Sequence, residues 1–241
     1  MTARPLLLLH PLGVDHRFWD PVRACLPDAM GDVVVPDLLG HGGAALPPEE
    51  PSVEAFADAV EKELDGAGQV DVVGVSLGGL VGQVLAARRP DLVRRLVVAD
   101  AVAVYPAPMQ QMWRERAATV RREGLAAVAE PMEQLWFTEP FRRDAADQVA
   151  AVREVLLAGD PEGYARTCEA LATADTSEAA RSIAAPVLVL CGEQDAPPFQ
   201  QAVEWFTAAL QDVRAEWLPG GHAAAYENPQ PFADALARFL A

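Results

Sequence analysis

A short apolar run that ends in a glycine–serine–glycine turn is the feature that most limits how this chain can fold. Residues 70–75 (VDVVGV) lead into Gly74 to Gly78 (GVSLG), and an apolar stretch from 77 to 88 follows without a linker. The first run has the length of a buried strand, and the second has the length of a helix. A strand that turns directly into a helix predicts a sharp bend with Ser76 at its apex.

The same alternation of short apolar runs and helix-length stretches fills the first hundred residues. The runs are too continuous for half-exposed strands. Strands are expected at 5–10, 32–36, 70–75 and 93–100, and helices at 18–26, 52–64 and 77–88. Strands that alternate with helices predict a parallel sheet with right-handed crossovers.

Beyond residue 105 the strand pattern stops, and charged, alanine-rich sequence of helical character continues to about 181. Helices are expected there at 109–122 and 144–157. The alternation then resumes, with strands at 186–191 and 213–218 and helices at 199–210 and 231–240. We therefore predict an α/β core (1–104 and 182–241) with about six mostly parallel strands and helices on both faces. A helical lid (105–181) is inserted after the fourth strand.

The length and the charge of the chain restrict its possible partners. A chain of 241 residues suits one good-sized core, and 35 acidic against 19 basic residues give a formal net charge of −16. Such a surface repels phosphate backbones and anionic lipid, so neither nucleic acid nor membrane is an expected partner. The apolar start at 6–9 is too short for a signal peptide or a membrane span, which predicts a cytoplasmic protein. The sequence leaves open whether it is a monomer or a homo-oligomer.

The cysteines and the glycine-rich loops give no sign of a metal or a cofactor. Cys25, Cys168 and Cys191 lie far apart without a C-x-x-C pair, which suits neither a disulfide framework nor a zinc site. Free buried thiols are expected. The sequence also contains no phosphate-cradling glycine loop, so we predict no metal and no cofactor.

Ser76 is the candidate nucleophile, and a serine hydroxyl needs a base to become one. Of the four histidines, His10, His16 and His41 precede Ser76, and only His222 follows it. His222 comes after the last expected strand, where the chain turns at the carboxyl edge of the sheet and functional groups gather in this architecture. The chain order serine, acid, histidine also selects His222 as the base.

The acid that orients the histidine is expected in a loop after an intervening strand. Asp195 follows the strand at 186–191 and fits this position directly. Asp100, at the end of the strand 93–100, is the rival, because some folds of this type place the acid one strand earlier. Glu193 is a third choice. The sequence favours Asp195 without excluding the other two.

Acyl transfer also needs backbone N–H groups aimed at the developing negative charge. One is expected from Leu77, the residue after the nucleophile. The second should come from the loop after the first strand, where Pro11 has no N–H and Leu12 is the natural donor. The glycines around His41 suit a tight turn, and we expect a structural role for this histidine.

Four segments together resemble the α/β-hydrolase superfamily: 10–13 (HPLG), 37–42 (DLLGHG), 74–78 (GVSLG) and 220–222 (GGH). The resemblance covers nearly the whole chain and implies the α/β-hydrolase fold. The lid is more specific. Residues 135–138 (LWFT), 163–165 (GYA) and 168–171 (CEAL) resemble the lid of 3-oxoadipate enol-lactonases, as do 12–13 with 19–21 and the segment 112–124.

This resemblance implies a serine hydrolase that opens a small-molecule lactone ester of aromatic-acid catabolism through an acyl-enzyme, with Trp136 lining the pocket. Leu135 and Leu39 stand where that family usually carries arginine, and its two first strands have no counterpart here. Arginine holds carboxylates by bidentate pairing, so a neutral lactone or ester is also open. Three other arginines are candidates to replace the missing ones: Arg17, Arg142 and Arg143.

Two further functions fit the same pattern. The short N-terminus and the 10–13 and 37–42 loops also resemble the menaquinone-pathway synthase, a lyase that eliminates pyruvate, in which the same triad would abstract a proton. A ligand receptor that keeps the fold without turnover is the alternative from another class.

Overall fold

Six strands form one sheet in the computed structural model, which describes residues 4–64 and 66–241, so that residues 1–3 of the predicted core lie outside it. The strand order is β2-β1-β3-β4-β5-β6, and every neighbouring pair is parallel. This confirms the predicted parallel α/β sheet. The strands are β1 (Leu6–Leu9), β2 (Val33–Val34), β3 (Val70–Val75), β4 (Val93–Ala99), β5 (Val187–Gly192) and β6 (Val213–Leu218).

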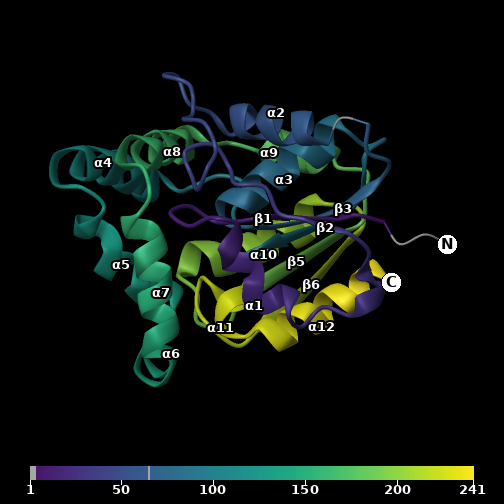
Figure 1. The fold of residues 1–241 in the computed structure, drawn as a ribbon. Coiled ribbons are helices and arrows are strands. Elements are labelled where there is room, and N and C mark those ends of the chain that lie inside the picture. The colour runs from purple at the N-terminus through teal and green to yellow at the C-terminus, as the bar shows by residue number, and fades with distance from the viewer. Residues whose placement is uncertain (1–3, 65) are drawn as a thin grey trace.

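Helices cover both faces of the sheet (Figure 1). On one side lie α2 (Val53–Glu63), α3 (Leu77–Arg88) and α9 (Ser177–Ser182), and on the other lie α1 (Asp20–Arg23), α11 (Ala224–Glu227) and α12 (Pro229–Leu240). The helix α10 (Pro197–Ala209) packs on β5 and β6. The α3 helix is buried along most of its length, because it crosses the centre of the sheet directly behind β3.

Among the described residues, six helices lie between β4 and β5, where the sequence predicts a helical insertion; α9 packs on α3, and the other five form the insertion. These five are α4 (Ala107–Glu123), α5 (Ala126–Trp136), α6 (Glu139–Asp144), α7 (Ala146–Leu157) and α8 (Pro161–Thr173). We call α4 to α8 the helical insertion. Figure 1 shows it at the end of the molecule far from both termini. That it works as a lid over a site stays a prediction.

The second strand is shorter and less buried than the sequence predicts. The run 32–36 contributes only Val33 and Val34 to the sheet, and both side chains are half-buried. The strand lies at the edge of the sheet, so one of its sides has no neighbour. Pro36 cannot donate a ladder hydrogen bond, which limits further pairing.

The expected helix at 18–26 is also interrupted. A 3₁₀ turn, η1 (His16–Trp19), comes first, and α1 begins at Asp20 with Pro21 in its first turn. A proline ring is accepted in the first turn of a helix but not further inside one, so the segment restarts there. A second 3₁₀ turn, η2 (Asp28–Met30), precedes β2.

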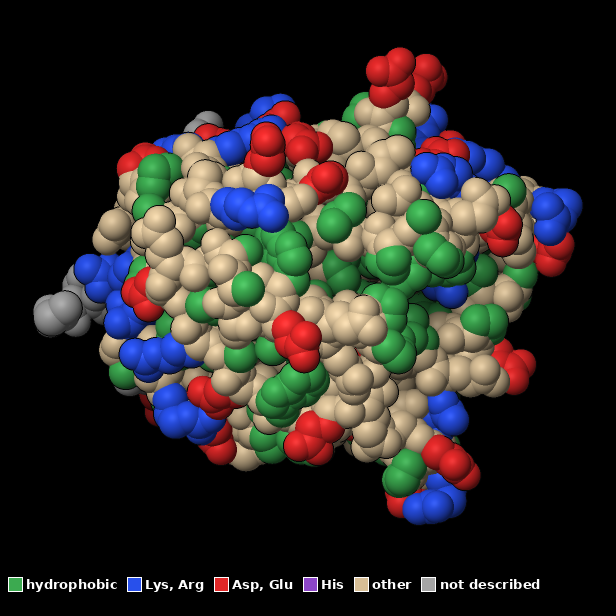
Figure 2. Space-filling view, turned by 180° about the vertical axis from the view of Figure 1, so that it is seen from behind, with side chains coloured by type: hydrophobic (Ala, Val, Ile, Leu, Met, Phe, Trp, Pro, Cys, Tyr) green, Lys and Arg blue, Asp and Glu red, His purple; other side chains and the backbone are tan. Residues whose placement is uncertain are grey.

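The surface of the molecule carries charges of both signs and some apolar side chains. Figure 2 shows acidic and basic side chains interspersed on one face, with apolar side chains gathered at a hollow between the main body and the helical insertion.

The thiols of Cys168 and Cys191 are free and buried, whereas the free Cys25 is only half-buried. Among the described residues, no helix combines the length and the apolar character needed to cross a bilayer.

Candidate functional site

The turn at Ser76 has the strained geometry that its glycines predict. Ser76 has φ 53° and ψ −112°, a conformation that side-chain-bearing residues rarely adopt. A Cβ on Gly74 would lie 2.1 Å from the Gly78 carbonyl oxygen, and one on Gly78 would lie 2.1 Å from the Leu9 carbonyl oxygen. Strand, turn and helix therefore pass too close together for any residue but glycine. Strain of this kind persists only where the surrounding structure enforces it, which is typical of functional sites.

Three side chains from three separate loops meet at this turn. The Oγ of Ser76 lies 3.0 Å from Nε2 of His222, and Nδ1 of His222 lies 2.9 Å and 3.2 Å from the two carboxylate oxygens of Asp195. All three residues are buried, with exposed fractions of 5%, 3% and 4% for Ser76, His222 and Asp195. A carboxylate beside Nδ1 favours the tautomer with its proton on Nδ1, which leaves Nε2 free to accept from the serine hydroxyl.

The structure places Asp195, and not its two rivals, against His222. Asp195 also accepts a hydrogen bond of 2.6 Å from the Ala196 N–H. Asp100 accepts the Gly192 N–H at 2.7 Å, and its other carboxylate oxygen has no partner among the described residues. Glu193 is exposed.

The second carboxyl group beside Asp195 favours its protonated form. Asp100 is 1% exposed, and its carboxyl oxygen lies within 4.8 Å of acceptor atoms of Asp195 and Cys191. Burial, and next the negative charge of Asp195, raise the pKa of Asp100 well above the ordinary range of an aspartate. Two carboxylates so close together cannot both stay ionised at low cost, and Asp195 is the one that has a histidine partner.

Replacing Asp100 by asparagine is expected to flatten the dependence of stability on pH. Aspartate ionises near pH 4 in an unfolded chain, whereas folded Asp100 keeps its proton to higher pH. Between these two pKa values the folded state binds one more proton, so the free energy of unfolding falls with rising pH by about 1.4 kcal/mol per pH unit from this group. Urea unfolding of the wild type and Asp100→Asn at a series of pH values above about pH 4 measures this slope. Equal slopes would contradict a protonated Asp100.

The two backbone N–H groups that the sequence singles out, those of Leu12 and Leu77, have no acceptor within the described part of the chain. Leu77 is the first residue of α3, where orphan N–H groups and the helix dipole favour negative charge. In the loop after β1, the Gly13 N–H is already taken by Nε2 of His41 at 3.0 Å, whereas the Leu12 N–H is free among the described residues.

Two neutral histidines hold the loop that carries Leu12. His10 lies 2.8 Å from the Pro11 carbonyl through Nδ1 and accepts the Leu38 N–H at 2.9 Å through Nε2. Burial, and next the neighbouring His41, lower the pKa of His10 to about 3, and burial also lowers the pKa of His41. Both rings therefore act as uncharged connectors between the loop after β1 and the loop after β2, which is the structural role expected for His41.

The helical insertion lies directly on the loop that carries His222. The Trp136 carbonyl accepts the Ala223 N–H at 3.0 Å, and the Leu135 carbonyl accepts the His222 N–H at 3.4 Å. The Trp136 side chain is buried and meets Phe18 edge to face, with ring centroids 5.9 Å apart. The insertion thus contacts the site through its backbone, and the Trp136 ring lies among aromatic neighbours.

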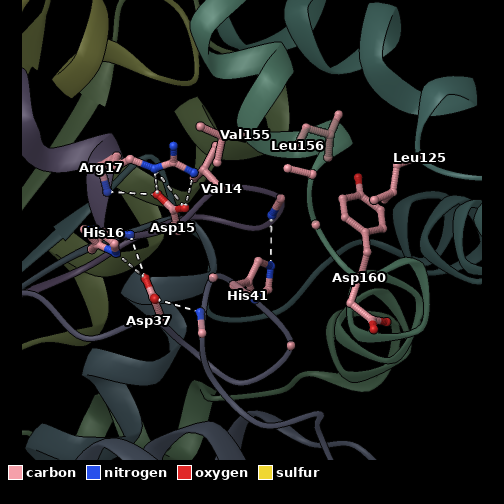
Figure 3. Close-up of a pocket in the computed structure, with 17 residues that line it drawn as sticks. Val14, Asp15, His16, Arg17, Asp37, His41, Leu125, Val155, Leu156 and Asp160 are labelled. Carbon is pink, nitrogen blue, oxygen red and sulfur yellow. Dashed lines mark hydrogen bonds and ion pairs between the residues drawn. The ribbon is translucent and has the colours of Figure 1, made fainter.

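The three arginines considered as carboxylate ligands are all engaged elsewhere. Arg17 forms a bidentate pair with Asp15, at 2.6 to 3.1 Å (Figure 3). Arg142 donates to the carbonyls of Gln134 and Phe137 within the insertion, and Arg143 pairs with Asp144. None of these three guanidinium groups bonds to a residue of the Ser76 site.

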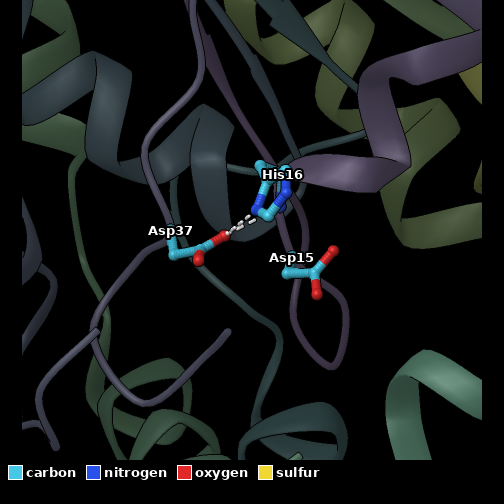
Figure 4. A group of neighbouring side chains, drawn as sticks. All are labelled: Asp15, His16 and Asp37. Carbon is cyan, nitrogen blue, oxygen red and sulfur yellow. Dashed lines mark hydrogen bonds and ion pairs between the residues drawn. The ribbon is translucent and has the colours of Figure 1, made fainter. Parts of the chain in front are cut away.

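A cavity of about 380 Å³ opens beside the loop after β1 (Figure 3), and Ser76, His222 and Asp195 are not among the residues that line it. Asp15, His16 and Asp37 gather at its wall, but their oxygens are in use (Figure 4). Asp37 accepts the His16 and Gly43 N–H groups and faces the His16 ring, and Asp15 faces Arg17. Although burial acts in the opposite sense, these hydrogen bonds lower the pKa of both aspartates. The group therefore ties two loops together.

Sequence reasoning missed three residues at the site. Phe199 packs on His222 with ring centroids 4.2 Å apart, and Tyr105 packs on Phe199. Glu227 accepts from the Gly221 N–H and from Thr138, so it joins the His222 loop to the insertion. Tyr105 and Phe199 both follow strands at the carboxyl edge of the sheet, and that position was the signal available in the sequence.

Comparisons of the sequence and of the fold both find similarity to known hydrolases. A family model described as "Alpha/beta hydrolase family" matches residues 6–235. 3-Oxoadipate enol-lactonase 2 of Acinetobacter baylyi is 32% identical over 236 residues, which cover 97% of this chain and 87% of that protein. The pimeloyl-[acyl-carrier protein] methyl ester esterase of Aromatoleum aromaticum is 30% identical over 252 residues, 95% of each chain. The crystal structure of the enol-lactonase from Burkholderia xenovorans LB400 superposes with a TM-score of 0.94 and 29% identity, covering 100% of this chain and 92% of that one.

Proposed function

The chain belongs to the alpha/beta hydrolase family, and on that premise we propose that it cleaves a small carboxylic ester or lactone through an acyl-enzyme on Ser76. The observation that carries the proposal is the chain of hydrogen bonds from Ser76 through His222 to Asp195 at a strained turn. A nucleophile, a base and a group that orients the base are thereby within reach of one another, which is the arrangement that activates a serine.

The reaction then proceeds in two halves. Ser76 attacks the carbonyl carbon while His222 takes the serine proton, and the Leu12 and Leu77 N–H groups stabilise the oxyanion of the tetrahedral intermediate. His222 returns the proton to the leaving oxygen as the carbon–oxygen bond breaks. A water activated by His222 next hydrolyses the acyl-enzyme and restores Ser76. Asp195 holds the imidazole in the required tautomer throughout.

The substrate that we favour is 3-oxoadipate enol-lactone or a close analogue. Support comes from an enol-lactonase relative that is 32% identical and aligns over 97% of this chain. In this proposal Trp136, on the insertion beside His222, lines the substrate pocket.

A neutral ester or lactone is the second candidate, and a specific observation favours it. Leu135 and Leu39 carry no charge, and the three alternative arginines are held by partners outside the site. The aromatic ring of Phe199 packs on His222, and that of Tyr105 packs on Phe199. A site of this composition binds an apolar acyl group more readily than a carboxylate.

A hydrolysis screen with purified protein tests the proposal. It compares 3-oxoadipate enol-lactone with neutral lactones and p-nitrophenyl acetate, and it uses Ser76→Ala as the blank. Preferential opening of the enol-lactone that depends on Ser76 supports the first substrate. Activity confined to neutral esters supports the second.

If the purified protein hydrolysed none of these esters and lactones, the proposed function would be overturned. Elimination of pyruvate from the menaquinone precursor without ester cleavage would then indicate the lyase. Stoichiometric ligand binding without product would indicate a receptor.

A further inference from the structure

Tyr105 places a hydroxyl group at the Ser76 site that nothing in the protein uses. The residue follows β4, is 1% exposed and packs edge to face against Trp113 and Phe199, with ring centroids 5.6 Å and 6.3 Å away. Its hydroxyl oxygen is buried and has no hydrogen-bond partner among the described residues. A buried hydroxyl without a partner destabilises a fold, so its presence here needs an explanation.

The ring of Tyr105 meets Phe199, which in turn packs on His222. Ser76 and Asp195 are both close enough to influence the Tyr105 hydroxyl. Burial raises the pKa of Tyr105 above the ordinary range of a tyrosine, despite an opposing effect of Ser76. Tyr105 is therefore a protonated O–H donor at every pH at which such an enzyme would be assayed.

The loop that carries Tyr105 is held from three sides. The buried Gln83 donates to the Val102 carbonyl at 3.1 Å, and the N–H and hydroxyl of Thr176 donate to the Ala103 carbonyl at 2.8 Å and 3.0 Å. Gln110 donates to the Tyr105 carbonyl at 2.9 Å. A donor fixed in this way needs no reorganisation when charge develops beside it, which is the property that makes such donors effective.

The order of the strands indicates which oxygen of a bound substrate the Tyr105 hydroxyl can reach. On one side of β3 lies β1, whose loop carries the Leu12 N–H, and on the other lie β4, β5 and β6. Tyr105, Asp195 and His222 follow those three strands in turn. Tyr105 is thus on the His222 side of Ser76, opposite Leu12. The leaving oxygen must lie on this side, because it takes its proton from His222.

We propose that the Tyr105 hydroxyl donates a hydrogen bond to the leaving oxygen of an ester or lactone bound at Ser76, a role that rests on the proposed hydrolase function. The Ser76 Oγ–carbon bond forms, the bond from carbon to the leaving oxygen breaks, and the proton on the leaving oxygen comes from His222. Tyr105 keeps its own proton and only stabilises the negative charge that builds up before that transfer. Tyr105 is then a catalytic residue for acylation.

The test is Tyr105→Phe, which removes only the hydroxyl. We would measure kcat/KM, which reports acylation, for p-nitrophenyl, phenyl and ethyl acetate, whose leaving groups are increasingly basic. The expected loss grows along this series from a few-fold to about 100-fold, because a hydrogen bond to a more basic leaving oxygen is stronger. Tyr226→Phe is the matched control, since that ring stacks on Phe18 instead, and its losses should be small and equal for all three esters.

Two further measurements separate the possible failures. The melting temperature of Tyr105→Phe should equal or exceed that of the wild type, because the variant loses a buried group without a partner; a lower value would mean that the hydroxyl has a structural role. Labelling of Ser76 by a fluorophosphonate checks the nucleophile independently. Suppose that the wild type is labelled and turns over esters, but that Tyr105→Phe loses no kcat/KM or loses the same factor for all three esters. That result overturns the role of Tyr105 alone. Absence of labelling and turnover in the wild type overturns the proposed function instead.

Discussion

Replacing Ser76 by alanine is expected to lower kcat by at least about a thousandfold while the fold stays intact. The substitution removes the attacking oxygen, and the small Cβ of alanine occupies space that the serine already fills. The Leu12 and Leu77 N–H groups would remain in place, so a slow background reaction through substrate binding and oxyanion stabilisation should persist. Ester turnover gives the change in kcat, and thermal unfolding followed by circular dichroism checks the fold.

Ser182→Ala is the matched control for this experiment. Ser182 is exposed, and among the described residues its hydroxyl bonds only to the Ala179 carbonyl of its own helix. The control should keep wild-type kcat. If Ser76→Ala kept a tenth or more of the wild-type rate, Ser76 would not be the nucleophile.

Replacing Asp195 by asparagine is the second large effect, with an expected fall in kcat of about 10⁴-fold. The carboxylate now lies 2.9 Å from Nδ1 of His222 and favours a proton on that nitrogen. An amide NH₂ in the same place favours the other tautomer, which points a proton at Ser76 and removes the base. Steady-state kinetics on the same ester measures the loss, and a melting temperature checks that the variant folds.

Asp100→Asn provides a control that is close in space and identical in chemistry. The Asp100 carboxyl is buried beside Asp195, yet its hydrogen bond goes to the Gly192 N–H and not to the histidine. Because the raised pKa of Asp100 favours its neutral form, a neutral amide is a close substitute, and kcat should stay near the wild-type value. Activity that survives in Asp195→Asn but not in Asp100→Asn would reverse the assignment of the acid.

Local sequence was enough to predict the elbow and the topology around it. The apolar run of β3, the glycines flanking Ser76 and the apolar start of α3 describe one short segment whose contacts are mostly internal. The alternation of strands and helices predicted the parallel sheet, because a strand buried on both faces must be apolar throughout. The interruption at 105–181 likewise gave the position of the helical insertion.

The sequence did not predict the contacts between side chains that lie far apart in the chain. Asp195 and Asp100 both follow strands at the same edge of the sheet, and only the packing of the β5 and β6 loops shows which of them meets His222. The same holds for Arg17, which is a free arginine in the sequence and a partner of Asp15 in the structure. Tyr105 follows a strand, but this position alone does not show which side chains it meets, because its neighbours come from α4, α10 and the Ser76 turn.

The sequence by itself therefore determined the class of fold, the strained turn with its serine, and the histidine, since these depend on periodicity, glycine sterics and chain order. Only the tertiary structure decided which carboxylate lies against His222, which arginines are already paired, and which tyrosine lies close to Ser76. The physical reason is that hydrogen bonds and burial depend on distances between side chains far apart in the chain. Those distances depend on how the loops pack at the edge of the sheet, and a local pattern in the sequence does not predict that packing.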